Sequence, residues 1–158
     1  MLTTAADQFI AATESRRWRA LVVDDMSSAC RALGIALSSI GGQVTTAHDG
    51  AQALELVRLA RSSGLAFDLV VTDIQMPVMD GIQMVRQMRR EGFAGPVIAI
   101  SGADDPDLLE STLAAGCDEV HRKPLSLTTL QMIVSRYLPA GAKRGPAGYA
   151  CRWLSRPQ

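Results

Sequence analysis

The side chains of this sequence that could do chemistry together are three carboxylates, a hydroxyl and an amine, and each follows a short run of residues that we expect to form a strand. Three carboxylates brought close together repel one another, so such a cluster either takes up protons or recruits a cation. Neither His nor Cys follows these runs, so the ligands are hard oxygens, which favour Mg²⁺ or a similar hard ion over zinc. The residues are Asp24, Asp25, Asp73, Ser101 and Lys123.

Phosphate is the substrate group that such a set would suit. Mg²⁺ held by one or two carboxylates keeps coordination positions open for phosphate oxygens. Ser101 could donate to one phosphoryl oxygen and Lys123 could neutralise another, so that one carboxylate could attack phosphorus. Taken singly, each residue has an ordinary interpretation, as a helix cap, a turn residue or a surface cation. Only the joint pattern favours an active site.

The elements that must position these residues are short strands and amphipathic helices in alternation. Runs of four or five apolar, β-branched residues are typical of strands buried on both faces, and the segments between them have helical spacing. Five strands alternating with five helices predict an α/β fold with a parallel sheet covered on both faces, whose carboxyl edge carries the ligand site. We expect strands over 18–23, 43–47, 68–72, 96–100 and 118–122, and helices over 26–40, 49–60, 81–90, 105–116 and 127–137.

Length and composition set limits on the class of protein. With 158 residues, 47% of them hydrophobic, the chain suits one folded domain, which we place over 18–138. That apolar content excludes disorder throughout, and no window resembles a membrane span or a secretory signal. The three cysteines form no CxxC pair, so we expect reduced thiols in a cytoplasmic protein, two of them filling the core.

The two ends of the chain differ from its middle. Residues 1–17 have a weak helical pattern and form either an extra helix or a loose arm, which could cap the sheet or contribute to a homodimer. Residues 139–158 carry four bases and no acid, whereas the rest carries a net charge of −4, and we expect a flexible basic tail. An acidic body argues against direct nucleic-acid binding. The tail run Cys151-Arg152-Trp153-Leu154 is either a docking segment or a frayed terminus.

Four motifs together resemble the receiver domain of two-component response regulators. They are Val22-Val23-Asp24-Asp25, the run from Val71 to Gly81 that reads VTDIQMPVMDG, the single Ser101, and Lys123-Pro124. The resemblance covers about residues 18–138. It implies a flavodoxin-like, doubly wound five-stranded sheet with strand order 2-1-3-4-5.

The resemblance also implies roles for the individual residues. Asp73 would accept a phosphoryl group from a partner's phosphohistidine, while Ser101 and Lys123 would bind phosphoryl oxygens. Asp24 and Asp25 would hold Mg²⁺ together with the Asp73 carboxylate and the backbone carbonyl of Gln75. The partners would be a sensor histidine kinase or a histidine phosphotransfer protein, and a downstream protein target.

Further positions follow from the same resemblance. Lys123-Pro124 would be a cis peptide, and Pro77 and Gly81 would shape the loop after the acceptor. Gln75 and Ala103 occupy positions where the family tunes the lifetime of the phosphate: Gln75 could orient a water, and Ala103 leaves space. Val120 stands where the family commonly has Tyr or Phe, and alternation along the strand points His121 to the other face. Signalling could instead use the loop after the fourth strand and the helix starting near Asp105.

Two other classes of function remain alternatives. A haloacid-dehalogenase-like phosphatase also uses an aspartyl nucleophile with Mg²⁺, but it needs a second acid two residues after the first, and here Met26 and Gln75 stand there. A phosphorylation-independent adaptor would not need the complete set of polar residues. About 20 residues follow the domain, too few for an output domain, so we expect a stand-alone receiver that is not an enzyme.

Overall fold

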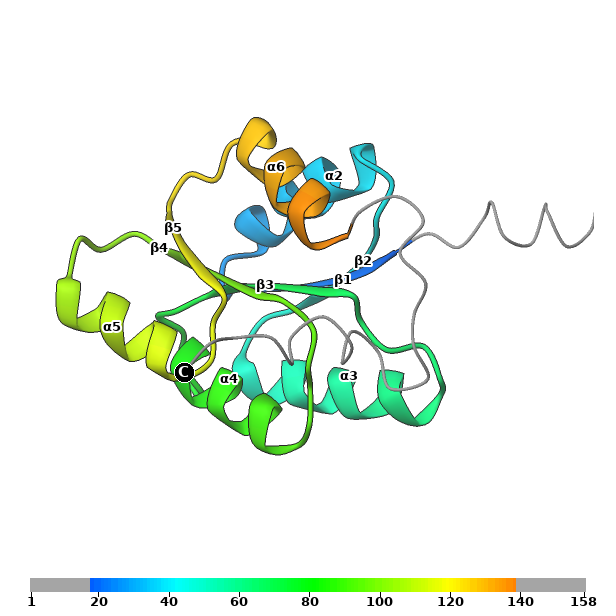
Figure 1. Cartoon of the computed structure of the whole chain (residues 1–158), viewed down its shortest axis with the longest axis horizontal. Helices are drawn as coiled ribbons and strands as arrows, with labels where there is room; N and C mark the ends of the chain where they lie inside the picture. Colours follow the sequence, from blue (N-terminus) through cyan, green and yellow to red (C-terminus); the bar gives the residue numbers. More distant parts are fainter. Residues whose placement is uncertain (1–17, 139–158) are drawn as a thin grey trace, which may run out of the picture.

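The computed structural model describes residues 18–138 and shows five strands alternating with five helices (Figure 1). Each expected strand and helix is present, with ends shifted by at most a few residues. Residues 1–17 and 139–158, to which we assigned a helical extension and a flexible tail, lie outside the described range. The elements are β1 (Arg19–Val23), α2 (Ser27–Ser39), β2 (Gln43–Ala47), α3 (Gly50–Ser62), β3 (Leu69–Asp73), α4 (Gly81–Arg90), β4 (Val97–Ser101), α5 (Pro106–Ala114), β5 (Glu119–Arg122) and α6 (Leu127–Tyr137).

All five strands are parallel, in the order β2-β1-β3-β4-β5, which confirms the expected doubly wound sheet. The register aligns the carboxyl ends of neighbouring strands. Val23 pairs with Ala47 on one side and with Thr72 on the other, and Asp73 pairs with Ile100. Residues that directly follow β1, β3, β4 and β5 therefore emerge at one edge of the sheet.

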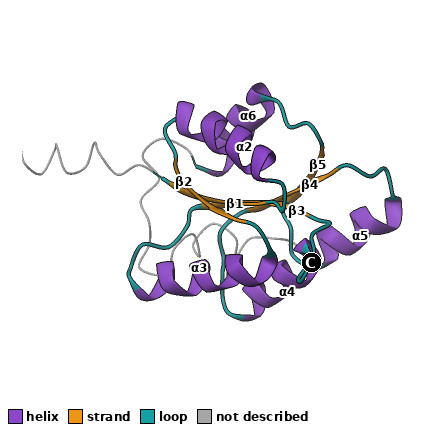
Figure 2. Cartoon of the chain, turned by 180° about the vertical axis from the view of Figure 1, so that it is seen from behind, coloured by secondary structure: helices purple, strands orange, loops and turns teal. Residues whose placement is uncertain are grey.

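Helices cover both faces of the sheet, with α2 and α6 on one face and α3, α4 and α5 on the other (Figures 1 and 2). Alternation along the strands supplies both layers of core. Leu21 and Val23 pack on the side of α3 and α4, whereas Ala20 and Val22 pack on the side of α2 and α6. Each large side chain buried in this way contributes about 1.5–3 kcal/mol, so the central strands hold the edge that carries the polar residues.

Side-chain caps set where four of the five helices begin. Asp49 accepts from the backbone of Gln52 at the start of α3, and Ser126 caps α6 in the same way. A reciprocal capping box opens α4, and the Asp105 cap followed by proline opens α5 as expected. Each cap is worth about 1 kcal/mol. Helix α2 lacks a side-chain cap at its first turn.

Two of the three cysteines are free thiols buried in the core, as expected. Cys30 lies on the side of α2 and α6, and Cys117 lies on the opposite side of the sheet. Burial raises the pKa of the Cys117 thiol to about 12, so this thiol stays protonated at neutral pH. Cys151 is outside the described residues. None of the described helices has the length and apolar character needed to cross a bilayer.

Candidate functional site

Three carboxylates converge at the carboxyl edge of the sheet. Asp24 and Asp25 follow β1, and Asp73 ends β3; one oxygen from each lies within 4.8 Å of the others. Asp24 is 1% exposed and Asp73 is 8% exposed, whereas Asp25 faces solvent. The cluster therefore combines two buried acids with one acid at the surface.

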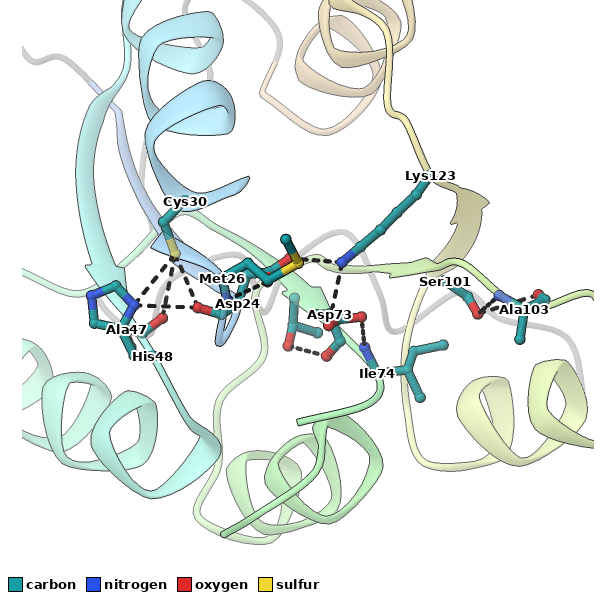
Figure 3. Close-up of polar contacts among 11 residues, drawn as sticks. Asp24, Met26, Cys30, Ala47, His48, Asp73, Ile74, Ser101, Ala103 and Lys123 are labelled. Carbon is teal, nitrogen blue, oxygen red and sulfur yellow. Dashed lines mark hydrogen bonds and ion pairs between the residues drawn. The ribbon is translucent and has the colours of Figure 1, made fainter. Parts of the chain in front are cut away.

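Lys123 reaches this cluster from the end of β5 (Figure 3). Its Nζ lies 2.8 Å from Oδ2 of Asp24 and 3.3 Å from Oδ2 of Asp73. Partial burial opposes the charge of the amine, but the hydrogen bond to Asp24 and the charge of Asp73 outweigh it, so the pKa of Lys123 is raised. The peptide bond between Lys123 and Pro124 is cis, as the resemblance implied.

The carboxyl group of Asp73 is buried and lies close to the charges of Asp24 and Lys123. Burial raises its pKa, the charge of Asp24 adds to the rise, and Lys123 opposes it. Its Oδ1 accepts a hydrogen bond from the backbone N–H of Ile74 at 2.8 Å. The positive charge of one ammonium is therefore set against the negative charges of three carboxylates. This excess of negative charge favours binding of a further cation.

The donor set fits the hard cation that the family implies. Only carboxylate oxygens contribute to the cluster, and Mg²⁺ prefers oxygen ligands. The backbone of Met26 donates to Oδ1 of Asp24 at 2.9 Å, which orients that carboxylate. A hydrogen bond of this kind fixes the orientation of a carboxylate that would bind a metal ion.

Ser101 ends β4 at the same edge but does not touch the carboxylates. Its Oγ accepts from the backbone N–H of Ala103 at 3.0 Å, and Figure 3 shows this pair apart from the contacts of Asp73 and Lys123. Within residues 18–138 no hydrogen bond joins Ser101 to Asp73. Four of the five residues are therefore brought together, and the fifth lies nearby with its hydroxyl engaged elsewhere.

The loop after Asp73 is held tightly against the end of β3. The N–H of Gly81 donates to the carbonyl of Ile74 at 2.8 Å. A Cβ at Gly81 would lie 2.3 Å from the carbonyl oxygen of Asp73, so only glycine permits this approach. Within the loop Val78 has a φ of 69° and is 85% exposed, a strained conformation for a β-branched residue. Gln75 is exposed in the same loop.

Two residues that the sequence analysis left out of the site lie directly behind Asp24. The thiol of Cys30 donates to the carbonyl of Asp24 at 3.2 Å, and Nδ1 of His48 lies 3.3 Å from the same oxygen. Figure 3 shows both side chains converging on it. The strand-end rule could have identified His48, because it directly follows β2. Nothing in the spacing singled out Cys30 from a core residue.

Strand β5 carries Val120 at the position where the resemblance leads us to expect an aromatic residue. Its side chains alternate between the two faces of the sheet, as expected. Val120 packs against the core on the side of α3 and α4. His121 lies on the other face, where its Nε2 is 2.7 Å from Oε2 of Glu119. Tyr137 of α6 also donates to Glu119, at 2.8 Å. The imidazole is thus part of a contact between β5 and α6 and points away from Asp73.

Comparison with known proteins identifies one family over most of the chain. The profile of the response regulator receiver domain matches residues 20–135. The response regulator MprA of Mycobacterium ulcerans is 36% identical over 112 residues, which cover 71% of this chain and 46% of MprA. The sensor histidine kinase RcsC of Salmonella typhimurium is 33% identical over 117 residues, which cover 74% of this chain and 12% of RcsC. The chain therefore spans less than half the length of either relative.

Solved structures agree with this assignment. The chemotaxis protein CheY4 of Vibrio cholerae superposes with a TM-score of 0.70 at 29% identity, over 78% of this chain and 100% of that one. A CheX-CheY-BeF3-Mg complex from Borrelia burgdorferi includes a chain with a TM-score of 0.69 at 28% identity, over 77% of this chain and 90% of that one. The likeness extends over the described sheet and helices.

Proposed function

Because the chain belongs to the response regulator receiver domain family of two-component, phosphorylation-based signalling, we propose that Asp73 is its phosphoacceptor. The observation that carries this proposal is the convergence of Asp24, Asp25 and Asp73 on one another, with the Lys123 amine between two of them. Asp73 is buried, and burial raises its pKa. A raised pKa makes the ionised carboxylate more basic and so a better nucleophile.

The transfer we propose is a displacement at phosphorus. One carboxylate oxygen of Asp73 forms the new P–O bond as the P–N bond of a partner's phosphohistidine breaks, and the electron pair stays on the imidazole, which takes up a proton. Lys123 binds an equatorial oxygen and shields the negative charge between phosphoryl group and carboxylate. To donate to another oxygen, the hydroxyl of Ser101 must give up its hydrogen bond to the carbonyl of Ala103.

Asp24 and Asp25, with the Asp73 carboxylate and the backbone carbonyl of Gln75, would hold Mg²⁺. When bound, the ion supplies positive charge that neutralises the phosphoryl oxygens and screens the acids from one another. The partners we propose are a sensor histidine kinase or histidine phosphotransfer protein as donor and a second protein as target. The CheX-CheY complex shows such a protein pairing for a structural relative.

A small phosphodonor such as acetyl phosphate tests the proposal directly. With Mg²⁺, the intact protein should gain one acid-stable, hydroxylamine-labile phosphoryl group, as measured by mass spectrometry. EDTA should prevent labelling. Labelling that persists in EDTA contradicts the role of the hard ion, and multiple turnover of a phosphomonoester would instead indicate an aspartyl phosphatase.

A further inference from the structure

Helix α5 presents an apolar face to solvent that no described element covers. Only Thr112 of this helix is fully buried, and Leu108 packs against the core from the same side. On the opposite side Leu109 and Leu113 are each 45% exposed. They are one helical turn apart, so their side chains form one continuous patch.

Acidic side chains lie on the same helix and just before it. The segment 102–117 contains four acids and no base, and Arg122 pairs with Asp104 at its edge. Asp105 caps its own helix, whereas Asp107 and Glu110 make no ion pair with any described residue. Several acids on other surfaces, such as Glu91 with Arg58 and Asp118 with Arg89, are already matched. The α5 face therefore combines exposed leucines with uncompensated negative charge.

The C-terminal segment of the same chain has the complementary chemistry. Residues 139–158 carry four bases and no acid, and Arg152 and Arg156 lie on either side of Trp153-Leu154. Tryptophan and arginine are the residue types that contribute most to protein contacts. Opposite charges at the margin of an apolar contact favour one register over others.

We propose that the segment 151–156 docks on the outer face of α5, with Trp153 and Leu154 against Leu109 and Leu113. Arg152 and Arg156 would then lie beside Asp107 and Glu110. The occupant is this chain's own C-terminal segment. The contact does not depend on the role of Asp73.

The intervening chain is long enough for this contact. Leu138, at the end of α6, is the last described residue, and 13 residues lie between it and Arg152. An extended chain of that length spans up to about 45 Å, and α5 and α6 lie on the two faces next to the same edge strand, β5 (Figures 1 and 2). A link of this length keeps the segment at about millimolar effective concentration, so a weak contact would be populated.

A spin label on Cys151 of the full chain tests the contact by NMR. Thiol labelling should be selective, because Cys30 and Cys117 are buried and burial raises the pKa of both. At low salt we expect the label to broaden the amide signals of 107–114 several-fold more than those of α3. Trp153→Ala with Leu154→Ala should remove that difference, as should Arg152→Glu with Arg156→Glu.

A charge exchange and a mixing experiment decide between occupants. Adding Asp107→Lys and Glu110→Lys to the Arg152→Glu, Arg156→Glu protein should restore the broadening, whereas Lys143→Glu with Arg144→Glu, a matched charge change nearer α6, should largely preserve it. Equal broadening of α3 and α5, or broadening that these variants leave unchanged, overturns the proposal. So does broadening that appears only when spin-labelled, unenriched protein is mixed with unlabelled ¹⁵N protein, because a second copy would then be the occupant.

Discussion

The Nζ of Lys123 lies 3.3 Å from Oδ2 of Asp73, at the point where two non-adjacent strands of the sheet end. The same amine is 2.8 Å from Oδ2 of Asp24. Lys123 therefore occupies the position of a counter-ion for two acids that we propose as metal ligands. A cation bound to those acids and the ammonium compete for the same negative charge.

Replacing Lys123 by methionine should separate these two roles. Without the ammonium, the carboxylates should bind Mg²⁺ more tightly, by about tenfold, or about 1.4 kcal/mol. Labelling by acetyl phosphate should nevertheless slow, because a phosphoryl oxygen loses its cation. Titration calorimetry measures the first effect and mass spectrometry the second. Weaker Mg²⁺ binding in the variant would contradict the competition between the two cations.

Cys30 and His48 should influence Mg²⁺ binding although neither is a ligand. Both contact the carbonyl of Asp24 from behind, and loss of groups that orient a ligand lowers metal affinity. We expect Cys30→Ala and His48→Ala each to weaken Mg²⁺ binding by up to about tenfold. His48→Asn, which keeps a donor, should recover part of the loss. Cys117→Ala, another buried thiol, is the matched control and should leave the affinity unchanged.

The carboxylate of Glu119 should make stability depend on pH in the acidic range. Burial opposes its charge, but hydrogen bonds from His121, Tyr137 and Arg136 outweigh this and lower its pKa below the ordinary value of 4.5. Its contribution is therefore present above about pH 4.5 and is lost as the pH falls through the lowered pKa. Glu119→Gln should flatten the decline of the unfolding free energy between pH 5 and 3, measured by urea denaturation.

The exposed acid Glu55, replaced by Gln, is the control for this measurement. Its carboxylate lies 3.8 Å from Arg58 on the same helix, and an exposed pair of this kind contributes little to stability, so the substitution should leave the slope with pH nearly unchanged. An identical slope in wild type and Glu119→Gln would show that the contact between β5 and α6 carries no pH-dependent stability.

Val78 should be a position where the wild-type residue costs stability. Its φ of 69° lies in the left-handed region. This conformation costs an L-residue about 1–2 kcal/mol, and it is especially unfavourable for residues that are branched at Cβ. Glycine removes this cost but loses more entropy on folding, so Val78→Gly should raise the unfolding free energy by about 0.5–1 kcal/mol. Thermal denaturation tests it, and a lower midpoint would show that the backbone is not strained there.

The sequence predicted the fold and the convergence of the acids because both follow from local patterns. Short β-branched runs and helical spacing define the order of elements, and parallel strands bring Asp24, Asp73 and Lys123 to one edge. The start of the helix near Asp105 was recognisable for the same reason. These features depend on neighbours within a few residues of one another.

Other features of the site depend on side-chain conformation and packing across elements. The hydroxyl of Ser101 accepts a hydrogen bond from the backbone of Ala103 and does not contact Asp73. The rotamer of the Ser101 side chain determines this choice of partner. The contacts of Cys30 and His48 with Asp24 join α2 and the end of β2 to the end of β1. The left-handed backbone of Val78 follows from closing the loop between β3 and α4, and valine itself gives no sign of it.

The central claim is that Asp73 alone accepts the phosphoryl group. The most direct measurement compares Asp73→Asn with Asp80→Asn in the full chain, labelled with acetyl phosphate and Mg²⁺ and analysed by peptide mass spectrometry. Asp80 caps α4 in the same loop region, and asparagine preserves a cap, so this control should label like the wild type. We expect no label in Asp73→Asn; a label of wild-type amount in that variant would contradict the account.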